Sequence, residues 1–163
     1  MMEYLYTFQI MIPEIILGLV FLVFFSLLNL PFGMITLVIA HTTFCVPYIF
    51  MMVKARLVGI DKSLEEAARD LGAGPVRTFF DITMPLIMPA VLSGSLLAFA
   101  MSFDDVVISI FVNGPRLNTL PVKVYAQLKT GVTPEINALC TIILAVIILV
   151  LVLSSLIAKK TQK

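Results

Sequence analysis

SLEEAARDLGAGPVRTFFDITMP, residues 63–85, is a polar interruption in an otherwise apolar chain. The chain has 163 residues, of which 60% are hydrophobic and only 13% are charged. Soluble domains are usually about one-quarter charged, so this chain has too few charges to cover the surface of a soluble fold. The composition therefore predicts a membrane protein in which the polar stretch lies outside the lipid.

The polar stretch carries the signals of a short helix followed by a turn. Ser63 and Glu66 have the spacing of a capping box, and the two alanines after Glu66 favour a helix. Gly72 is expected to end this helix in the left-handed conformation. The Gly-Pro pair at 74–75 is expected to turn the chain, and a second short helix is predicted over 76–82.

The first of these helices has a narrow stripe of small and apolar residues on one face. The stripe consists of Leu64, Ala67, Ala68 and Leu71. A helix that lies on lipid headgroups and a helix that docks on a protein both fit this pattern. Two alanines insert poorly into lipid, which favours a protein partner.

Four apolar segments are long enough to cross a bilayer as helices, because a span needs about 20 residues and these runs do not alternate as strands do. They lie at about 12–30, 33–53, 86–103 and 136–158. We therefore predict an all-α, polytopic membrane helix bundle that forms a single transmembrane domain over residues 1–163.

The distribution of Lys and Arg predicts the orientation. The loop 54–85 and the C-terminal tail together hold eight of these residues, whereas the segment 104–135 holds three. The positive-inside rule places the loop and the tail in the cytoplasm. The formal net charge of +1 gives no basic field for binding nucleic acid. The sequence has no G-x-x-x-x-G-K-[ST] loop, so ATP hydrolysis would need a separate subunit.

Three acids, Glu14, Asp104 and Asp105, lie within or at the edge of the predicted spans. A carboxylate there is costly unless it is paired or hydrated, which makes each a candidate for binding a cationic cargo. We expect Glu14 near the inner end of its span and the aspartates near the outer end of theirs, with at most one aspartate facing the pathway. Structural roles stay open: Glu14 can sit in a first helical turn, and the aspartates can be solvated or paired with Arg116 or Lys123.

His41 is the only histidine and lies within the second span. A hydrogen bond to a neighbouring helix is favoured over a proton relay or a metal site. An intramembrane hydrolase that uses His41 and Asp105 is a weaker hypothesis, because the two lie on different spans. Gly94, flanked by serines, is expected to let another helix approach closely. The two cysteines lack metal-site spacing, and neither a metal nor a cofactor is expected.

The polar stretch resembles the EAA loop of binding-protein-dependent ABC importer permeases. The matching residues are Glu66, Ala67, Ala68, Gly72, Ile82 and Pro85. Met84 stands where leucine is usual. The resemblance implies that the stretch is a coupling helix that sits in a cleft on a separate ATP-binding subunit.

Three further segments are similar to C-type permease subunits of spermidine/putrescine importers. They are IPEIILGL (12–19), SFDDVVISIFVNGP (102–115) and LPVKVYAQLKTGVTPEINAL (120–139). This resemblance implies a type I ABC importer transmembrane domain in the bacterial inner membrane, with the first two of six spans missing from this sequence. It also implies a second permease subunit and an extracytoplasmic polyamine-binding protein as partners. Another small solute, and a truncated remnant that does not transport, are the alternatives.

Overall fold

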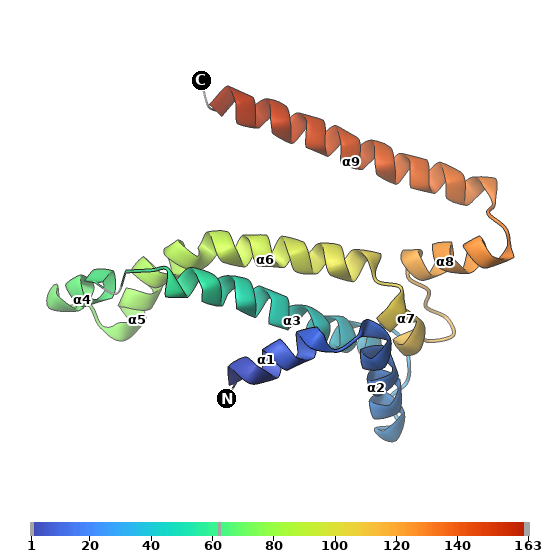
Figure 1. Ribbon diagram of the computed structural model, residues 1–163, viewed down its shortest axis with the longest axis horizontal. Coiled ribbons are helices and arrows are strands. Elements are labelled where there is room, and N and C mark those ends of the chain that lie inside the picture. The colour runs from blue at the N-terminus through green and yellow to red at the C-terminus, as the bar shows by residue number, and fades with distance from the viewer. Residues whose placement is uncertain (1, 62, 162–163) are drawn as a thin grey trace. The chain divides into compact units, whose positions relative to one another are not determined.

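The computed structural model describes residues 2–61 and 63–161, with side chains for residues 6, 8–61 and 63–149. This part of the chain consists of helices joined by short connections, and no strand occurs in it (Figure 1). The prediction of an all-α fold is confirmed. The chain divides into two compact units, residues 1–121 and 122–163, and each is described by itself.

The first unit holds most of the helices. They are α1 (Met2–Met11), α2 (Glu14–Leu27), α3 (Met34–Val58), α4 (Ser63–Asp70), α5 (Pro75–Thr78), a π-helical turn η1 (Phe79–Thr83), α6 (Met84–Asp104) and α7 (Val107–Val112). The second unit holds most of α8 (Leu120–Thr130) and all of α9 (Pro134–Thr161).

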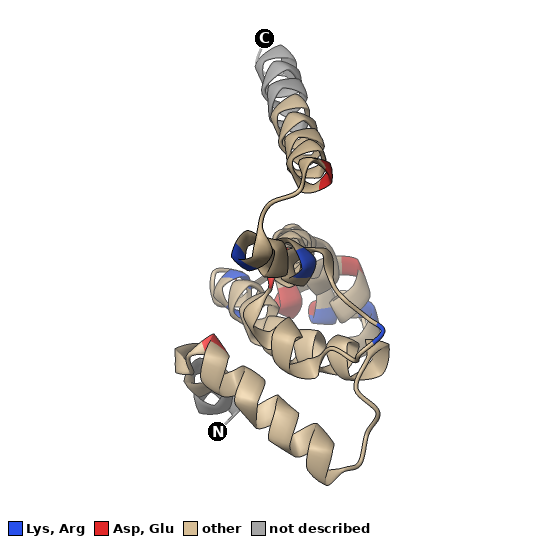
Figure 2. Cartoon of the chain, turned by 90° about the vertical axis from the view of Figure 1, so that its right-hand side faces the viewer, with Lys and Arg blue, Asp and Glu red and all other residues tan. Residues whose placement is uncertain are grey.

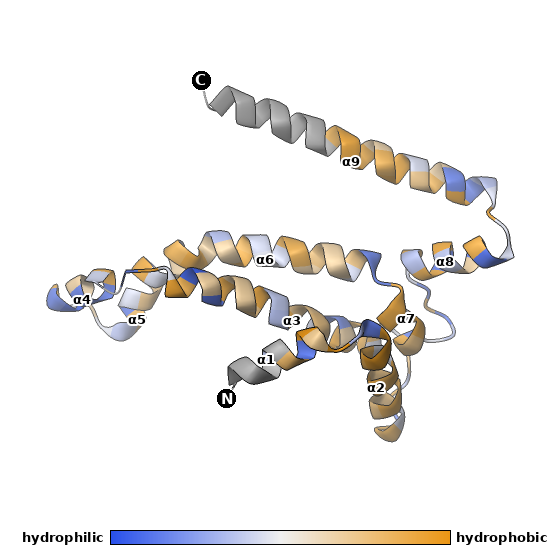
Figure 3. Cartoon of the chain, viewed as in Figure 1, coloured by the Kyte–Doolittle hydropathy of each residue, from blue (hydrophilic) through white to orange (hydrophobic). Residues whose placement is uncertain are grey.

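Helices α3 and α6 pack as an antiparallel pair, with α4 and α5 at the end where the chain turns between them (Figure 1). A Cβ atom added to Gly94 would lie 3.2 Å from the Cα of Ile49, so the backbones approach closely there. The prediction for Gly94 is therefore confirmed. Arg56 Nε also donates to the carbonyl of Leu86 at 3.0 Å. Both long helices are mainly apolar, whereas α4 is hydrophilic (Figure 3).

Helices α2 and α7 form a second packed pair. Leu17, Phe21 and Phe25 of α2 are buried in one cluster with Ile108 and Val112 of α7. Because α7 has only six residues, it depends on this apolar packing rather than on helix propensity.

The predicted first span, 12–30, is helical only over Glu14–Leu27. Its 14 residues extend about 21 Å, which is less than the hydrocarbon thickness of about 30 Å. Pro13 separates α1 from α2, since proline fixes φ and cannot donate a helical hydrogen bond. By length and composition, two helical stretches of the described part can cross a membrane, Met34–Val58 and Pro75–Asp104.

The predicted short helix at 76–82 and the predicted span at 86–103 form one continuous helical stretch, from Pro75 to Asp104. Within it, the Met84 N–H donates to the carbonyl of Phe79, five residues back. Pro85 follows directly. Its ring would collide with a carbonyl in a regular α-helical turn, and the wider π turn gives it room without ending the helix.

The loops at the far end of the α3–α6 pair are held together tightly. Thr36 Oγ1 accepts a bond from the Gly33 N–H at 2.8 Å and lies 2.9 Å from the carbonyl of Val112 at the end of α7. A Cβ atom on Gly114 would overlap the backbone carbonyl of Phe32. Only glycine therefore fits where the loop after α7 crosses the loop before α3.

Replacing Gly114 by alanine is expected to destabilise the chain by about 1–3 kcal/mol, because a backbone carbonyl cannot move away as a side chain can. Gly74→Ala is the matched control: its φ is −70° and nothing lies within 4 Å of the new Cβ. Melting of the two variants in detergent should show a loss for Gly114→Ala of about 2–4 °C per kcal/mol. Equal melting temperatures would contradict the crossing of the two loops.

Candidate functional site

A Schellman motif closes the C-terminal end of the polar helix α4. Gly72 has a φ of +83°. The Ala73 N–H donates to the carbonyl of Ala68 at 3.0 Å, and the Gly72 N–H donates to the carbonyl of Arg69 at 2.8 Å. These are the two bonds of the motif. Because a side chain would be strained at this φ, the prediction that Gly72 ends the helix is confirmed.

The N-terminal end of α4 differs from the predicted capping box. Ser63 is the first helical residue rather than the cap, and its N–H donates to Asp61 Oδ1 at 3.0 Å. This bond stabilises the carboxylate and lowers the pKa of Asp61. The prediction named the wrong residue: Asp61, placed two residues before the helix, supplies the acceptor.

Helix α4 packs with one face on α5 and η1. On that face Ala68 is only 7% exposed, and Glu65 accepts a hydrogen bond from Thr83 Oγ1 at 3.2 Å. Three residues with spacings of three and four lie exposed instead: Leu64, Ala67 and Leu71. The predicted stripe therefore loses Ala68 to the chain's own packing and keeps the other three as an exposed surface, which we call the α4 stripe.

The other residues of the EAA pattern lie near this stripe. Glu66 and Arg69 line a cavity of about 580 Å³ together with the end of α3. Ile82 is half-buried in η1, and Pro85 is exposed near the start of α6. The structure thus places the EAA residues on α4, Gly72 just after its end, and Ile82 and Pro85 on the helical stretch that begins at α5.

A second polar cluster lies where α2, α3, α6 and α7 meet. Glu14, Asp104 and Asp105 line one cavity of about 280 Å³, together with Phe44 and Met101. We call it the acid cavity. Glu14 is the acidic residue at the start of the otherwise uncharged α2 (Figure 2). The expectation that Glu14 lies at the opposite end of the bundle from the aspartates is wrong, because the chain breaks before α2 and α2 packs on α7.

The acid cavity lies well along α3 rather than at its end. Phe44 is about 15 Å from the start of this helix of about 37 Å, at 1.5 Å per residue. In a membrane that α3 crosses, this depth falls inside a hydrocarbon layer about 30 Å thick. The alternative in which Asp104 and Asp105 end a span at the headgroups stays a prediction.

Asp105 is 8% exposed and receives three hydrogen bonds from the start of α7. Its Oδ1 accepts from the Ile108 N–H at 3.1 Å, and its Oδ2 accepts from the Ser109 N–H and Oγ–H, both at 2.8 Å. Asp105 therefore caps α7 and is held by this cap rather than by Arg116. Asp104, in contrast, is exposed to the cavity.

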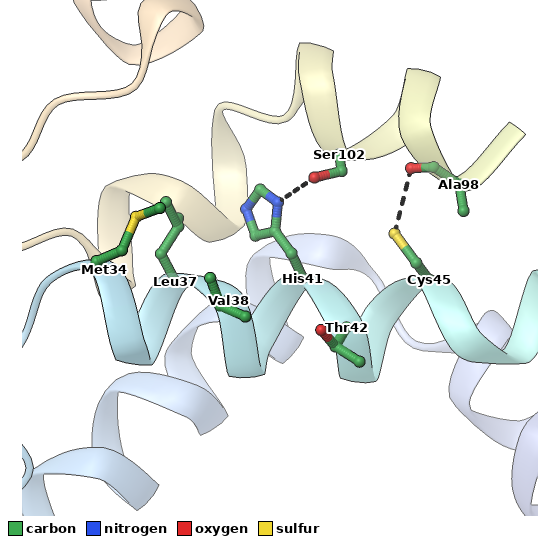
Figure 4. A pocket seen from close by; sticks show the side chains of 8 residues that line it. All are labelled: Met34, Leu37, Val38, His41, Thr42, Cys45, Ala98 and Ser102. Carbon is green, nitrogen blue, oxygen red and sulfur yellow. Dashed lines mark hydrogen bonds between the residues drawn. The ribbon is translucent and has the colours of Figure 1, made fainter. Parts of the chain in front are cut away.

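His41 connects three helices. Its Nδ1 lies 2.7 Å from Ser102 Oγ of α6 (Figure 4), and its Nε2 lies 3.1 Å from Ser109 Oγ and 3.3 Å from Asp105 Oδ2. The prediction that His41 bonds to a neighbouring helix is confirmed. Sequence reasoning missed both serines, although Ser102, Asp105 and Ser109 have the spacing of one polar face.

Ser102, His41 and Asp105 are connected in the order of a Ser-His-Asp triad, so the two residues of the hydrolase hypothesis do meet. Ser102 lies within α6, where the backbone N–H groups are engaged by carbonyls four residues back. They cannot form the oxyanion hole that acyl transfer requires. The geometry fits the positioning of charge rather than hydrolysis. Among the side chains that the structure describes, no three of His, Cys, Asp or Glu are grouped to hold a metal ion.

Comparison with known proteins identifies close relatives. The chain is 46% identical over 150 residues to the putrescine transport system permease protein PotI of Escherichia coli K12, covering 88% of this chain and 53% of PotI. It is 44% identical over 153 residues to the spermidine/putrescine transport system permease protein PotC of the same strain, covering 94% of this chain and 58% of PotC. PotC of Haemophilus influenzae is also 44% identical, over 93% of this chain and 59% of that protein.

The chain therefore spans little more than half the length of the curated relatives it matches. Residues 1–161 match the family described as "Binding-protein-dependent transport system inner membrane component". This match includes both α4 and the acid cavity. The chain belongs to this family of inner-membrane permease components of binding-protein-dependent transport systems.

Proposed function

We propose that this chain is a transmembrane permease subunit of an ATP-driven ABC importer that carries polyamines, spermidine or putrescine, across the bacterial cytoplasmic membrane. The observation that supports it best is the acid cavity, where Glu14, Asp104 and Asp105 gather among apolar helices. The names of the relatives PotI and PotC agree with this cargo.

The charge of the acid cavity suits a cationic cargo. Glu14 and Asp104 are exposed to the cavity. An ammonium group that leaves water must recover its hydrogen bonds, and a carboxylate supplies short, charge-assisted ones. Two such carboxylates on one cavity can receive the ammonium groups of a polyamine. A neutral sugar would leave these charges without a partner.

The exposed α4 stripe is the proposed contact with an ATP-binding subunit. Two exposed leucines and an alanine on a hydrophilic helix are typical of a docking surface. Thr83, which donates to Glu65 of α4, lies on the same continuous helical stretch as Asp104. Closure of the ATP-binding subunits can therefore move α4, and α6 carries this movement to the acid cavity. Transport proceeds by alternating access.

The proposed assembly contains further components. A second permease subunit completes the pathway, an extracytoplasmic polyamine-binding protein delivers the cargo, and lipids surround the helices. We place the chain as a multi-pass protein, with α4 and the C-terminus in the cytoplasm because most Lys and Arg lie there. An importer of another small solute and a remnant that does not transport remain the alternatives that uptake measurements separate.

Neutralising the open carboxylates is expected to reduce polyamine uptake. Glu14→Gln and Asp104→Asn should each lower uptake of radiolabelled putrescine at least about tenfold, because each removes a charge-assisted hydrogen bond. The charge-retaining variants Glu14→Asp and Asp104→Glu are the matched controls and should keep more activity. Uptake is measured in cells that carry the substitution in the chromosomal gene, per copy of the protein on immunoblots.

Two outcomes would count against the polyamine proposal. One is unchanged uptake of both putrescine and spermidine in both neutral variants, and the other is uptake of both polyamines that survives deletion of the gene.

Crosslinking from neighbouring alanines tests the α4 stripe. Ala67→Cys, labelled with a thiol-reactive photocrosslinker in native membranes, is expected to capture an ATP-binding subunit, identified by mass spectrometry. Ala68→Cys is the matched control: it lies one residue away but is buried, so it should react poorly. Both variants carry Cys140→Ser, since Cys140 is an exposed cysteine. If Ala67→Cys captures only lipid or other proteins, the docking proposal is wrong.

A further inference from the structure

His41 and Asp105 contact each other and line two different cavities. His41 and Ser102 line a cavity of about 410 Å³ between α3 and α6 (Figure 4). Asp105 lines the acid cavity. The two side chains meet at 3.3 Å, so this contact joins one lining residue of each cavity.

The neighbours of His41 determine which of its ring nitrogens donates a hydrogen bond and which accepts one. An ionised carboxylate only accepts, so the Nε2 that faces Asp105 carries a proton. In a neutral ring Nδ1 is then the acceptor, and the Ser102 hydroxyl donates to it. Both ring nitrogens therefore have partners, and the ring is held between α6 and the α6–α7 junction.

Asp105 has little capacity left for a cargo. One of its oxygens accepts from Ile108, and the other accepts from the backbone and the hydroxyl of Ser109 and faces His41. Asp105 is 8% exposed and has only the second lone pair of Oδ1 without a donor, whereas Asp104 and Glu14 are exposed.

We infer that His41 is a positioning residue: it holds Asp105, Asp105 holds the start of α7, and Glu14 and Asp104 are left as the carboxylates that receive the cargo. This division of roles rests on the proposed polyamine function, but the anchoring of α7 by His41 and Asp105 can be measured without any cargo.

The first test follows amide hydrogen exchange in the full-length protein, in lipid nanodiscs with the subunits that co-purify. His41→Ala is expected to speed exchange of the Ile108 and Ser109 amides at least about tenfold, because their acceptor Asp105 loses a partner that fixes it. His41→Gln keeps an N–H donor and should restore most of the protection. Thr42→Val, on the same turn of α3 and in the same cavity, should leave exchange unchanged.

The second test is a double-mutant cycle in putrescine uptake per copy of protein. If His41 acts through Asp105, then His41→Ala and Asp105→Asn should each lower the maximal uptake rate about tenfold. The maximal uptake rate of the double variant should then equal, within about twofold, that of the less active single variant.

The outcomes separate the two proposals. The positioning role would be overturned if the double variant lost uptake about one-hundredfold, which is the product of the two single losses. It would also be overturned if His41→Ala left amide exchange unchanged. Both conclusions hold even if Glu14→Gln and Asp104→Asn abolish uptake. Faster exchange in His41→Ala in a protein that carries neither putrescine nor spermidine would support the positioning role and refute the polyamine proposal.

Discussion

The close approach of α3 and α6 at Gly94 sets the register of the whole first unit. Because Gly94 has no side chain, the backbone of α3 can lie against it, and the contacts on either side follow at steps of one or two helical turns. The successive pairs are Arg56 with Leu86, Ile49 with Gly94, Cys45 with Ala98, and His41 with Ser102. This register brings the end of α6 level with the second turn of α3. The acid cavity forms at that level.

Charges in an apolar bundle need hydrogen-bond partners or solvent, and the three acids differ in which of these they have. Asp105 is buried, and its hydrogen bonds come from α7 and His41. Such a carboxylate contributes to the structure because it caps a helix that is too short to form alone. Glu14 and Asp104 lie open to the cavity. Their charge is balanced by water or by a cation, which is why we assign the cargo to them.

The helix from Pro75 to Asp104 joins the two functional surfaces. At one end, Thr83 holds α4, whose exposed stripe faces outward. At the other end, Asp104 borders the acid cavity. The π turn before Pro85 keeps this stretch continuous where a proline would otherwise break it. A rigid connection of this kind can transmit a displacement, which a flexible loop cannot do. On the proposed function, a displacement of α4 outside the apolar helices would be carried to the acid cavity inside them.

Local features of this protein could be predicted from the sequence, because they depend on residues that are close along the chain. The composition indicated apolar helices, Gly72 marked the end of α4, and the EAA spacing identified the family. Only the tertiary structure decided which polar groups meet. His41 and Asp105 are 64 residues apart, and no local pattern shows that helix packing brings them together. Glu14 lines the same cavity as Asp104 because Pro13 interrupts the helix and apolar contacts turn α2 onto α7. Ala68 turns inward while Ala67 faces outward, since adjacent helical residues point about 100° apart and the packing of α4 on α5 and η1 selects the face.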